Sequence, residues 1–389
     1  MRVVMDATAA VRQRAGVGRF ARGLLTGLAE IDTHNDYFLI TTGRHRLTLP
    51  ATSLPQRHHW VRLPVPERIA RIAWERLRLL PPPASFVPGA KIFFTADFAL
   101  PRLGRVPSIP TIHDLSFLTH PECADEGLRK YLSTEVPRSI HAASAVVAVS
   151  HTTARALQEL LGVEPAKIAV VPNGVDAQFR PLALTDETPP MPPFGLPTGY
   201  LLSVGTLEPR KNYVRLLQAF AKVQQRAKPA QSVTWPRSKP SSGYTLVIAG
   251  REGWKFEPIF REVARLNLAS SVKFMTNTSD SDLLALYQHA SAMVFPSLNE
   301  GFGIPPLEAM ACGIPVAAST GGALPEVLGD AALSFDAFDV DGMSAAIERI
   351  MQDEPLQCTL RERGTRRAAD YTWVRAATEA LQLFERVAA

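Results

Sequence analysis

The feature that most constrains this chain is the segment 291–320, SAMVFPSLNEGFGIPPLEAMACGIPVAAST. Its apolar run AMVFPS predicts a buried parallel strand. Gly301 and Gly303 follow, and residues without a side chain allow bare backbone to approach a ligand closely. Pro305 and Pro306 suit the first turn of a helix, where a missing amide hydrogen costs nothing. The segment therefore predicts a strand–loop–helix–strand unit, and in open α/β sheets ligands bind at the carboxyl ends of such strands.

Two carboxylates flank this turn, Glu300 in the loop and Glu308 in what we expect to be the first turn of the helix. A buried loop carboxylate can accept hydrogen bonds from sugar hydroxyls, and one at a helix start can hold the vicinal diol of a ribose. The alternative is that Glu308 only complements the helix dipole and that Glu300 is an ordinary loop residue. Taken singly, neither residue decides between these explanations.

The length of 389 residues exceeds what one hydrophobic core usually serves, so we expect two domains. No apolar run is long enough to cross a bilayer, and the first residues, MRVVMDATAA, lack the apolar core of a signal peptide. The three cysteines are odd in number and widely spaced, which indicates reduced thiols rather than a disulfide framework. We therefore expect a cytoplasmic protein.

The charge is divided unevenly along the chain. Residues 1–183 hold 22 Lys and Arg against 15 Asp and Glu, a net charge of +7, whereas the remainder carries −2. A basic first half fits a domain that faces anionic lipid or a lipid diphosphate, although an arginine-rich solvated surface explains it nearly as well. Residues 68–80 predict a basic amphipathic helix that could lie on a membrane, but packing against a sheet is the commoner fate of such a helix.

Two more glycine loops stand between an expected strand and helix. In the first, Gly16 and Gly18 precede a helix, so backbone amides could approach a phosphate there; a lone pair of glycines is usually only a turn. In the second, Gly205 allows a tight turn, and Arg210 and Lys211 stand beside the helix start. Adjacent cations at a helix start favour an anion, because arginine forks onto phosphate oxygens and lysine adds a point charge. In isolation, a solvated basic pair would explain them equally.

The expected domain limits follow from composition. Residues 1–180 form a first α/β domain, and the proline-rich stretch 181–198 predicts an extended, semi-rigid linker. Residues 199–370 form a second α/β domain, and 371–389 a final helix. Carboxylate pairs such as that in DSD at 280–282 suit helix caps better than a metal site, so no metal is expected.

The residues from Ser297 to Ala323 resemble the signature of the retaining family 4 glycosyltransferases of the GT-B fold. GTLEPRKN at 205–212 resembles the same family, and TIHDLSFLTHPE at 111–122 is most similar to its mannosyltransferase-like bacterial members. The resemblance implies two doubly wound, Rossmann-like domains facing across a cleft. The first would bind the acceptor and the second the nucleotide-sugar, with the last helix crossing back to the first domain.

The same resemblance implies roles for particular side chains. Arg210 and Lys211 would hold the donor diphosphate and stabilise it as it leaves, while Glu300 would position the sugar and Glu308 the ribose. His113 would contact the donor sugar near its 6-hydroxyl, and the neighbouring Asp114 would orient the loop. The loop residues expected against the donor are Gly16, Gly18, Gly205, Gly301, Phe302, Gly303 and Ile304.

The resemblance thus implies an enzyme that moves a sugar from a nucleoside diphosphate to a hydroxyl with retention at the anomeric carbon. Similarity favours GDP-mannose as donor, used as a substrate without a cofactor, and a polyprenyl-diphosphate-linked oligosaccharide as acceptor in exopolysaccharide or O-antigen assembly. A glucosyl- or N-acetylglucosaminyltransferase that uses a UDP-sugar, or a binding homologue without catalysis, is the alternative. No nucleic-acid partner is expected, and contact with the cytoplasmic face of the membrane is left open.

Overall fold

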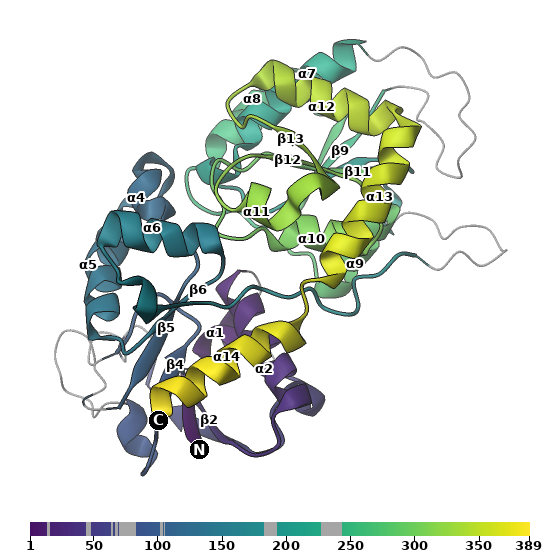
Figure 1. Cartoon of the computed structure of the whole chain (residues 1–389). Helices are drawn as coiled ribbons and strands as arrows, with labels where there is room; N and C mark the ends of the chain where they lie inside the picture. Colours follow the sequence, from purple (N-terminus) through teal and green to yellow (C-terminus); the bar gives the residue numbers. More distant parts are fainter. Residues whose placement is uncertain are drawn as a thin grey trace. The chain divides into compact units, whose positions relative to one another are not determined.

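A computed structural model describes residues 1–13, 16–43, 48–63, 65–66, 69, 83–101, 104, 106–182, 193–226 and 243–389 (Figure 1). The chain divides into two compact units, each described by itself. Unit 1 comprises Met1–Thr119, Glu126–Gly174 and Tyr371–Ala389, and unit 2 comprises His120–Asp125 and Val175–Asp370. The chain thus passes between the units four times.

Unit 1 is built on a parallel seven-stranded sheet in the order β3-β2-β1-β4-β5-β6-β7. Strands buried on both faces are mostly apolar, as the fully buried run IFFT of β4 shows. The order reverses between β1 and β4, which makes that pair the topological switch point of the sheet. The strands are β1 (Arg2–Asp6), β2 (Asp36–Thr42), β3 (His58–Leu63), β4 (Ile92–Thr95), β5 (Ser108–Ile112), β6 (Val146–Ala148) and β7 (Ile168–Val170).

The helices of unit 1 are α1 (Thr8–Arg12), α2 (Val17–Ile31), α4 (Ser116–Thr119), α5 (Glu126–Ala142), α6 (His151–Leu161) and α14 (Trp373–Ala388). Ser150 caps the start of α6, because its side chain accepts from the amide of Thr153 at 3.0 Å. Proline rarely lies inside a helix, but α5 continues through Pro137. A proline removes one backbone hydrogen bond, and the buried Val136 and Ile140 hold the helix on the sheet.

The last helix, α14, packs against α2 within unit 1, in agreement with the expectation for residues 371–389 (Figure 1). Three glycines make room for its first residue, Trp373. A Cβ on Gly23 would lie 2.0 Å from the indole, one on Gly27 2.1 Å from the Trp373 carbonyl oxygen, and one on Gly174 2.4 Å from its nitrogen. The end of the chain is therefore seated in unit 1 by contacts that only glycine permits.

Unit 2 is built on a parallel six-stranded sheet in the order β10-β9-β8-β11-β12-β13, with its switch point between β8 and β11. The strands are β8 (Leu201–Val204), β9 (Leu246–Ala249), β10 (Val272–Met275), β11 (Ala292–Phe295), β12 (Val316–Ser319) and β13 (Ala332–Phe335). The helices are α7 (Tyr213–Arg226), α8 (Glu257–Arg265), α9 (Asp280–His289), α10 (Ile304–Ala311), α11 (Leu324–Leu328), α12 (Val340–Gln352) and α13 (Glu354–Ala369).

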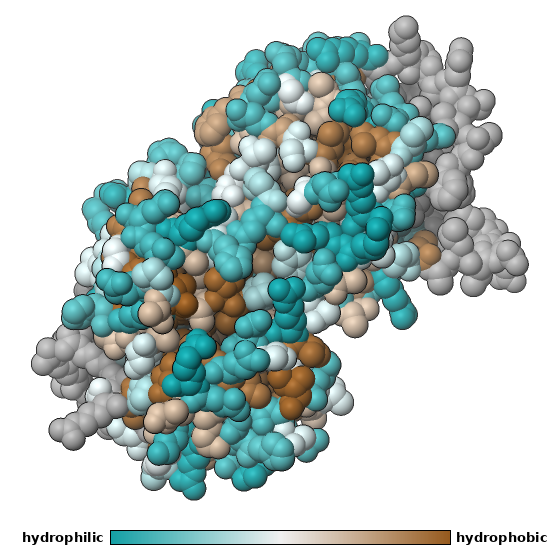
Figure 2. Space-filling model, in the orientation of Figure 1, coloured by the Kyte–Doolittle hydropathy of each residue, from teal (hydrophilic) through white to brown (hydrophobic). Residues whose placement is uncertain are grey.

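The strand–loop–helix–strand prediction for 291–320 is confirmed by β11, α10 and β12. The carboxylates at 280–282 are explained by capping, since Ser279 and Asp282 form a capping box at the start of α9. On the face drawn in Figure 2, hydrophilic side chains cover much of the described surface, with apolar patches between them. Buried apolar side chains form a core cluster within each unit.

Some expectations concern residues that the structure does not describe. The basic helix at 68–80 lies outside the described residues apart from Ile69, and so does most of the linker at 181–198. Its described end begins with a 3₁₀ turn, η6 (Pro193–Gly195). Among the described residues, no helix combines the length and the apolarity needed to cross a bilayer.

Residues 120–125, which the sequence placed in the first domain, belong with unit 2. Side chains of the loop after β9 hold their backbone carbonyls. The Trp254 indole donates to Cys123 O at 2.7 Å, and Lys255 Nζ donates to Glu122 O at 2.9 Å and Ala124 O at 3.0 Å. Contacts made by carbonyls rather than by side chains leave no trace in the sequence pattern.

Candidate active site

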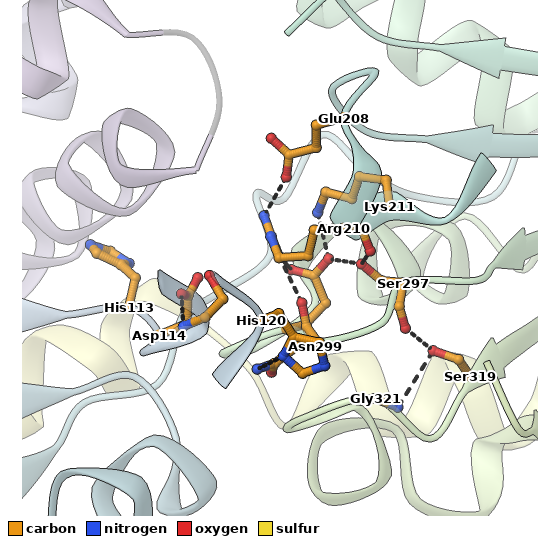
Figure 3. Close-up of polar contacts among 12 residues, drawn as sticks. His113, Asp114, His120, Glu208, Arg210, Lys211, Ser297, Asn299, Ser319 and Gly321 are labelled. Atoms are coloured by element: carbon orange, nitrogen blue, oxygen red, sulfur yellow. Dashed lines mark hydrogen bonds and ion pairs between the residues drawn. The ribbon is translucent and has the colours of Figure 1, made fainter. Parts of the chain in front are cut away.

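The switch point of unit 2 brings together residues that are far apart in sequence. The loop after β8 leads into a 3₁₀ turn, η7 (Pro209–Lys211), and the loop after the neighbouring β11 carries Asn299 and Glu300. Parallel strands end at the same edge of a sheet, so Arg210 and Lys211 (Figure 3) meet Glu300 there. Lys211 and Glu300 are 89 positions apart in the sequence. This is the position at which open α/β sheets bind their ligands.

An alternating network of charges occupies this edge. Arg210 Nη2 lies 2.8 Å from Glu208 Oε1, and its Nη1 lies 3.1 Å from Glu300 Oε2 and donates to Asn299 O at 2.7 Å. Lys211 Nζ pairs with Glu300 Oε1. The four charged side chains are between 4% and 17% exposed. Charges this well covered interact more strongly than they would in bulk water, and the two cations balance the two carboxylates.

Glu300 is held as a carboxylate. Burial by itself would raise its pKa, but the charges of Lys211 and Arg210 and the hydrogen bonds from Lys211 and Ser297 outweigh burial and lower the pKa to about 2. Glu300 is therefore ionised at neutral pH and is suited to accept hydrogen bonds. It has no proton to donate.

Asn212 fixes the turn that carries the two cations. Its backbone adopts the left-handed region at φ 60°, and its side chain is buried. The Nδ2 group donates to Pro296 O at 3.0 Å and to Ala337 O at 2.7 Å, so one amide ties the loop after β8 to the loops after β11 and β13. A fully bonded buried amide of this kind specifies a single arrangement of three loops.

Gly205 lies under the lysine. A Cβ at this position would stand 3.4 Å from Lys211 Cδ and 3.1 Å from Tyr213 Oη, and Tyr213 Oη donates to Gly205 O at 3.1 Å. An added Cβ would therefore crowd the Tyr213 hydroxyl, which donates to the carbonyl of the same glycine.

The glycine loop before α10 is also tightly packed. Gly303 has φ 108° and caps the helix, and a Cβ on it would lie 2.7 Å from Leu324 Cδ2. Gly301 and Phe302 are buried, and Ile304 is half-buried at the first position of α10. Ser297 donates to Glu300 Oε1, so the loop supports its own carboxylate.

The expectation that Glu308 lies in the first turn of its helix is wrong. Helix α10 begins at Ile304 and has no acidic residue in its first turn, so complementing the helix dipole does not explain Glu308. The side chain is 1% exposed, and Tyr287 Oη donates to its Oε2 at 2.9 Å. Glu308 is a buried, hydrogen-bonded carboxylate rather than a surface acid.

His113 follows β5 in unit 1. Its Nε2 lies 2.7 Å from Ala96 O, and since a carbonyl can only accept, Nε2 carries the hydrogen and Nδ1 of the neutral ring is an acceptor. The rings of Phe20 and Phe98 lie 5.3 and 5.4 Å from the imidazole. Burial lowers the His113 pKa, which keeps the ring neutral at pH 7. Asp114 Oδ1 accepts from Ser116 N at 2.8 Å and orders the turn, as expected (Figure 3).

The first glycine loop has structural reasons of its own. Gly16 has φ 53° at the start of α2, a conformation that favours glycine, and a Cβ there would meet open space. A Cβ on Gly18 would lie 2.1 Å from Gln13 O, so this glycine lets α2 pack against the end of α1. Both residues belong to unit 1, whereas Arg210, Lys211 and Glu300 converge in unit 2.

Sequence reasoning missed three supports of the charge network: Glu208, Asn212 and Asn299. Glu208 stands two positions before Arg210, is 3% exposed and forms an ion pair with it. A buried acid requires a partner. The pattern Glu-Pro-Arg-Lys therefore contained a signal for an internal ion pair.

The two Rossmann-like units agree with the GT-B fold, and comparison with known proteins identifies the family. Residues 191–367 match the family described as glycosyl transferases group 1, and residues 14–179 match glycosyltransferase family 4. The chain therefore belongs to the family 4 glycosyltransferases.

Curated relatives and a solved structure agree with this family. The chain is 30% identical over 296 residues to O-antigen chain mannosyltransferase B of Escherichia coli, covering 76% of this chain and 74% of that protein. It is 29% identical over 291 residues to the serotype-specific mannosyltransferase WbdA of Escherichia coli, covering 71% of this chain but 33% of that longer protein. The solved sucrose-phosphate synthase of Thermosynechococcus elongatus shares the fold, with a TM-score of 0.72 at 20% identity over 99% of this chain and 98% of that one.

Proposed function

We propose that this glycosyltransferase moves mannose from GDP-mannose to a hydroxyl of a polyprenyl-diphosphate-linked oligosaccharide, with retention, in exopolysaccharide or O-antigen assembly. The observation that carries the proposal is the pairing of Arg210 and Lys211 with Glu300 at the switch point of unit 2. The choice of mannose is supported by the names of the two Escherichia coli relatives.

The chemical demand of this reaction is charge. Negative charge grows on the leaving diphosphate, and fixed cations in a covered site stabilise it by several kcal/mol. We assign that role to Arg210, whose guanidinium can fork onto two oxygens, and to Lys211 as a point charge. Glu300, freed from part of this pairing by the incoming phosphate, would accept hydrogen bonds from the sugar.

The proposed transfer takes place on one face of the sugar. The bond from the anomeric carbon to the diphosphate oxygen breaks, the bond to the acceptor oxygen forms on the same face, and the acceptor proton passes to the departing phosphate. Glu300 with a pKa of about 2 supplies no proton in this scheme. We assign His113 Nδ1 the role of accepting a hydrogen bond from a hydroxyl of the donor sugar. We assign Glu308 the role of binding the ribose.

The donor is tested by calorimetric titration with GDP, UDP and ADP in EDTA, followed by transfer assays on lipid-linked acceptors. Preference for GDP and transfer of mannose in the α configuration would support the proposal. Preference for UDP would replace mannose by a glucosyl or N-acetylglucosaminyl donor. Binding of the donor without transfer to any acceptor would favour a non-catalytic homologue.

The role of Glu300 is tested by Glu300→Gln, which should lower turnover and spare nucleotide affinity. Glu262→Gln is a matched control, because Glu262 is also a buried acid of unit 2. It lies on α8 and is bonded to Arg265 of the same helix and to Gln218 of α7. Equal turnover of the two variants would remove Glu300 from the mechanism.

The lipid-linked acceptor has its own test. The net charge of +7 in residues 1–183 favours an anionic surface, so the protein should pellet with liposomes that contain anionic lipid and not with neutral ones. Equal pelleting with both kinds of liposome would remove the electrostatic argument for a lipid-linked acceptor.

A further inference from the structure

A tyrosine that the donor site does not yet include contacts the proposed ribose carboxylate directly. Tyr287, on α9, is 0% exposed, and its Oη donates to Glu308 Oε2 at 2.9 Å. The bond joins α9 to α10 across the interior of unit 2. Hydrogen bonds to a carboxylate are stronger than those between neutral groups, and a covered one is not weakened by water.

The tyrosine ring is itself held in place by the chain that enters unit 2 after Val175. The ring of Phe179 meets it edge-on, with centroids 5.7 Å apart and planes at 83°. Phe179 is 4% exposed, and the next carbonyl, that of Arg180, accepts from Gln288 Nε2 at 2.9 Å. Phe179, Tyr287 and Glu308 therefore form one packed series from the connecting chain to the carboxylate.

Two roles fit a carboxylate that is 1% exposed and bonded to a phenol. It could serve only to anchor α9 on α10, or the phenol could set the plane of the carboxylate so that a ribose diol finds it oriented. The helix dipole does not account for an acid in the second turn. We infer that Tyr287 is a positioning residue that orients Glu308 for the ribose, an assignment that rests on the proposed function.

The variant Tyr287→Phe removes only the hydroxyl and keeps the ring against Phe179. The probes are GDP and its 2′,3′-dideoxy analogue, titrated by calorimetry. Without an oriented carboxylate the ribose loses about one hydrogen bond to a charged group, so GDP should bind roughly tenfold or more weakly to the variant. The dideoxy analogue, which lacks the diol, should bind the variant and the wild type equally.

A matched control is Tyr200→Phe. Tyr200 is also 0% exposed in unit 2, and its Oη donates its hydrogen at 2.7 Å to the carbonyl of Leu286, the residue before Tyr287, rather than to Glu308. This variant should lower the melting temperature without changing the ratio of the two affinities. In a Glu308→Gln background, Tyr287→Phe should have no further effect on that ratio.

The outcomes separate the inference from the function on which it rests. If wild type binds GDP and the dideoxy analogue equally, the ribose role of Glu308 is wrong and the inference is overturned with it. If wild type discriminates but Tyr287→Phe preserves the ratio, Glu308 holds the ribose without help and the inference alone is overturned. A ratio that falls toward one in Tyr287→Phe and not in Tyr200→Phe supports it.

Discussion

The two sheets share a strand order around their switch points but differ in what those points contain. In unit 1, the carboxyl ends of β1 and β4 enclose a small cavity whose lining is apolar except for one acid: Met5, Asp6, Ala7, Ala21, Leu25, Phe94 and Ala96. In unit 2, the ends of β8 and β11 carry two cations and two acids within hydrogen-bond distance. The same topology therefore encloses a mostly apolar cavity at the switch point of unit 1 and carries a charge network at the switch point of unit 2.

The difference shows that the topology supplies a location and the loop residues supply the chemistry. A leaving diphosphate needs fixed positive charge, and among the described residues of the two switch points a buried cation pair, Arg210 and Lys211, lies in unit 2. In unit 1, the polar group of interest, His113, stands one strand further along, after β5, and is neutral. Each prediction below tests one side of this contrast.

The largest effect is expected from Lys211→Met, which removes a cation from the unit 2 switch point and leaves Arg210 paired with Glu300. Loss of one preorganised electrostatic partner typically lowers kcat by about 10²–10³-fold, so transfer should fall by that amount. Arg210→Lys, which keeps the charge and loses the fork, should cost roughly tenfold, as expected for one hydrogen bond to a charged group. Steady-state kinetics with GDP-mannose measure both.

Lys222→Ala is the control for this measurement. Lys222 is also a cation of unit 2 paired with an acid, Asp341, but the two side chains are 40% and 71% exposed. Exposed pairs contribute little, so the control should retain full activity. If Lys211→Met costs no more than Lys222→Ala, the charge network has no catalytic importance.

A smaller effect concerns stability against pH. The folded pKa of Glu300, about 2, lies below its ordinary 4.5, so its ionisation stabilises the fold above pH 4.5, and this contribution is lost as the pH falls toward 2. Linkage gives a loss of roughly 2 kcal/mol between pH 6 and pH 3. Urea unfolding should show wild type losing about that much more than Glu300→Gln over this range. Parallel losses in both proteins would contradict the network.

Much of unit 2 could be predicted because its signals are local. The strand–loop–helix–strand unit at 291–320 and the cation pair at 210 and 211 both stand in short stretches of sequence. Helix α13 was not predicted, because its sequence is polar and only Leu360, Gly364 and Ala368 are buried. Strand β3 was not predicted either, since HHWVRL is half-buried at the sheet edge and does not alternate cleanly.

Side-chain contacts over long separations were beyond sequence reasoning. Asn212 bonds to carbonyls 84 and 125 positions away, and Tyr287 reaches Glu308 from a different helix. Such contacts depend on the order in which the strands assemble. Local patterns identify a residue that needs a partner, but the fold decides which partner it meets.

The smallest effect tests the unit 1 side of the contrast. His113→Ala should lower kcat about tenfold, the cost of one lost hydrogen bond of about 1.4 kcal/mol, and leave GDP affinity unchanged.

Burial lowers the His113 pKa below its ordinary 6.5, so the neutral ring persists through pH 7 and is lost only at more acid pH. Wild-type kcat should therefore stay flat through pH 6.5 and fall only at more acid pH, whereas His113→Ala should lack that acid limb. His59→Ala is the control, because His59 stacks on Phe38 in the same unit at 4.8 Å without approaching this site. An acid limb that survives in His113→Ala would assign the titration to another group and leave unit 1 without a polar contribution to transfer.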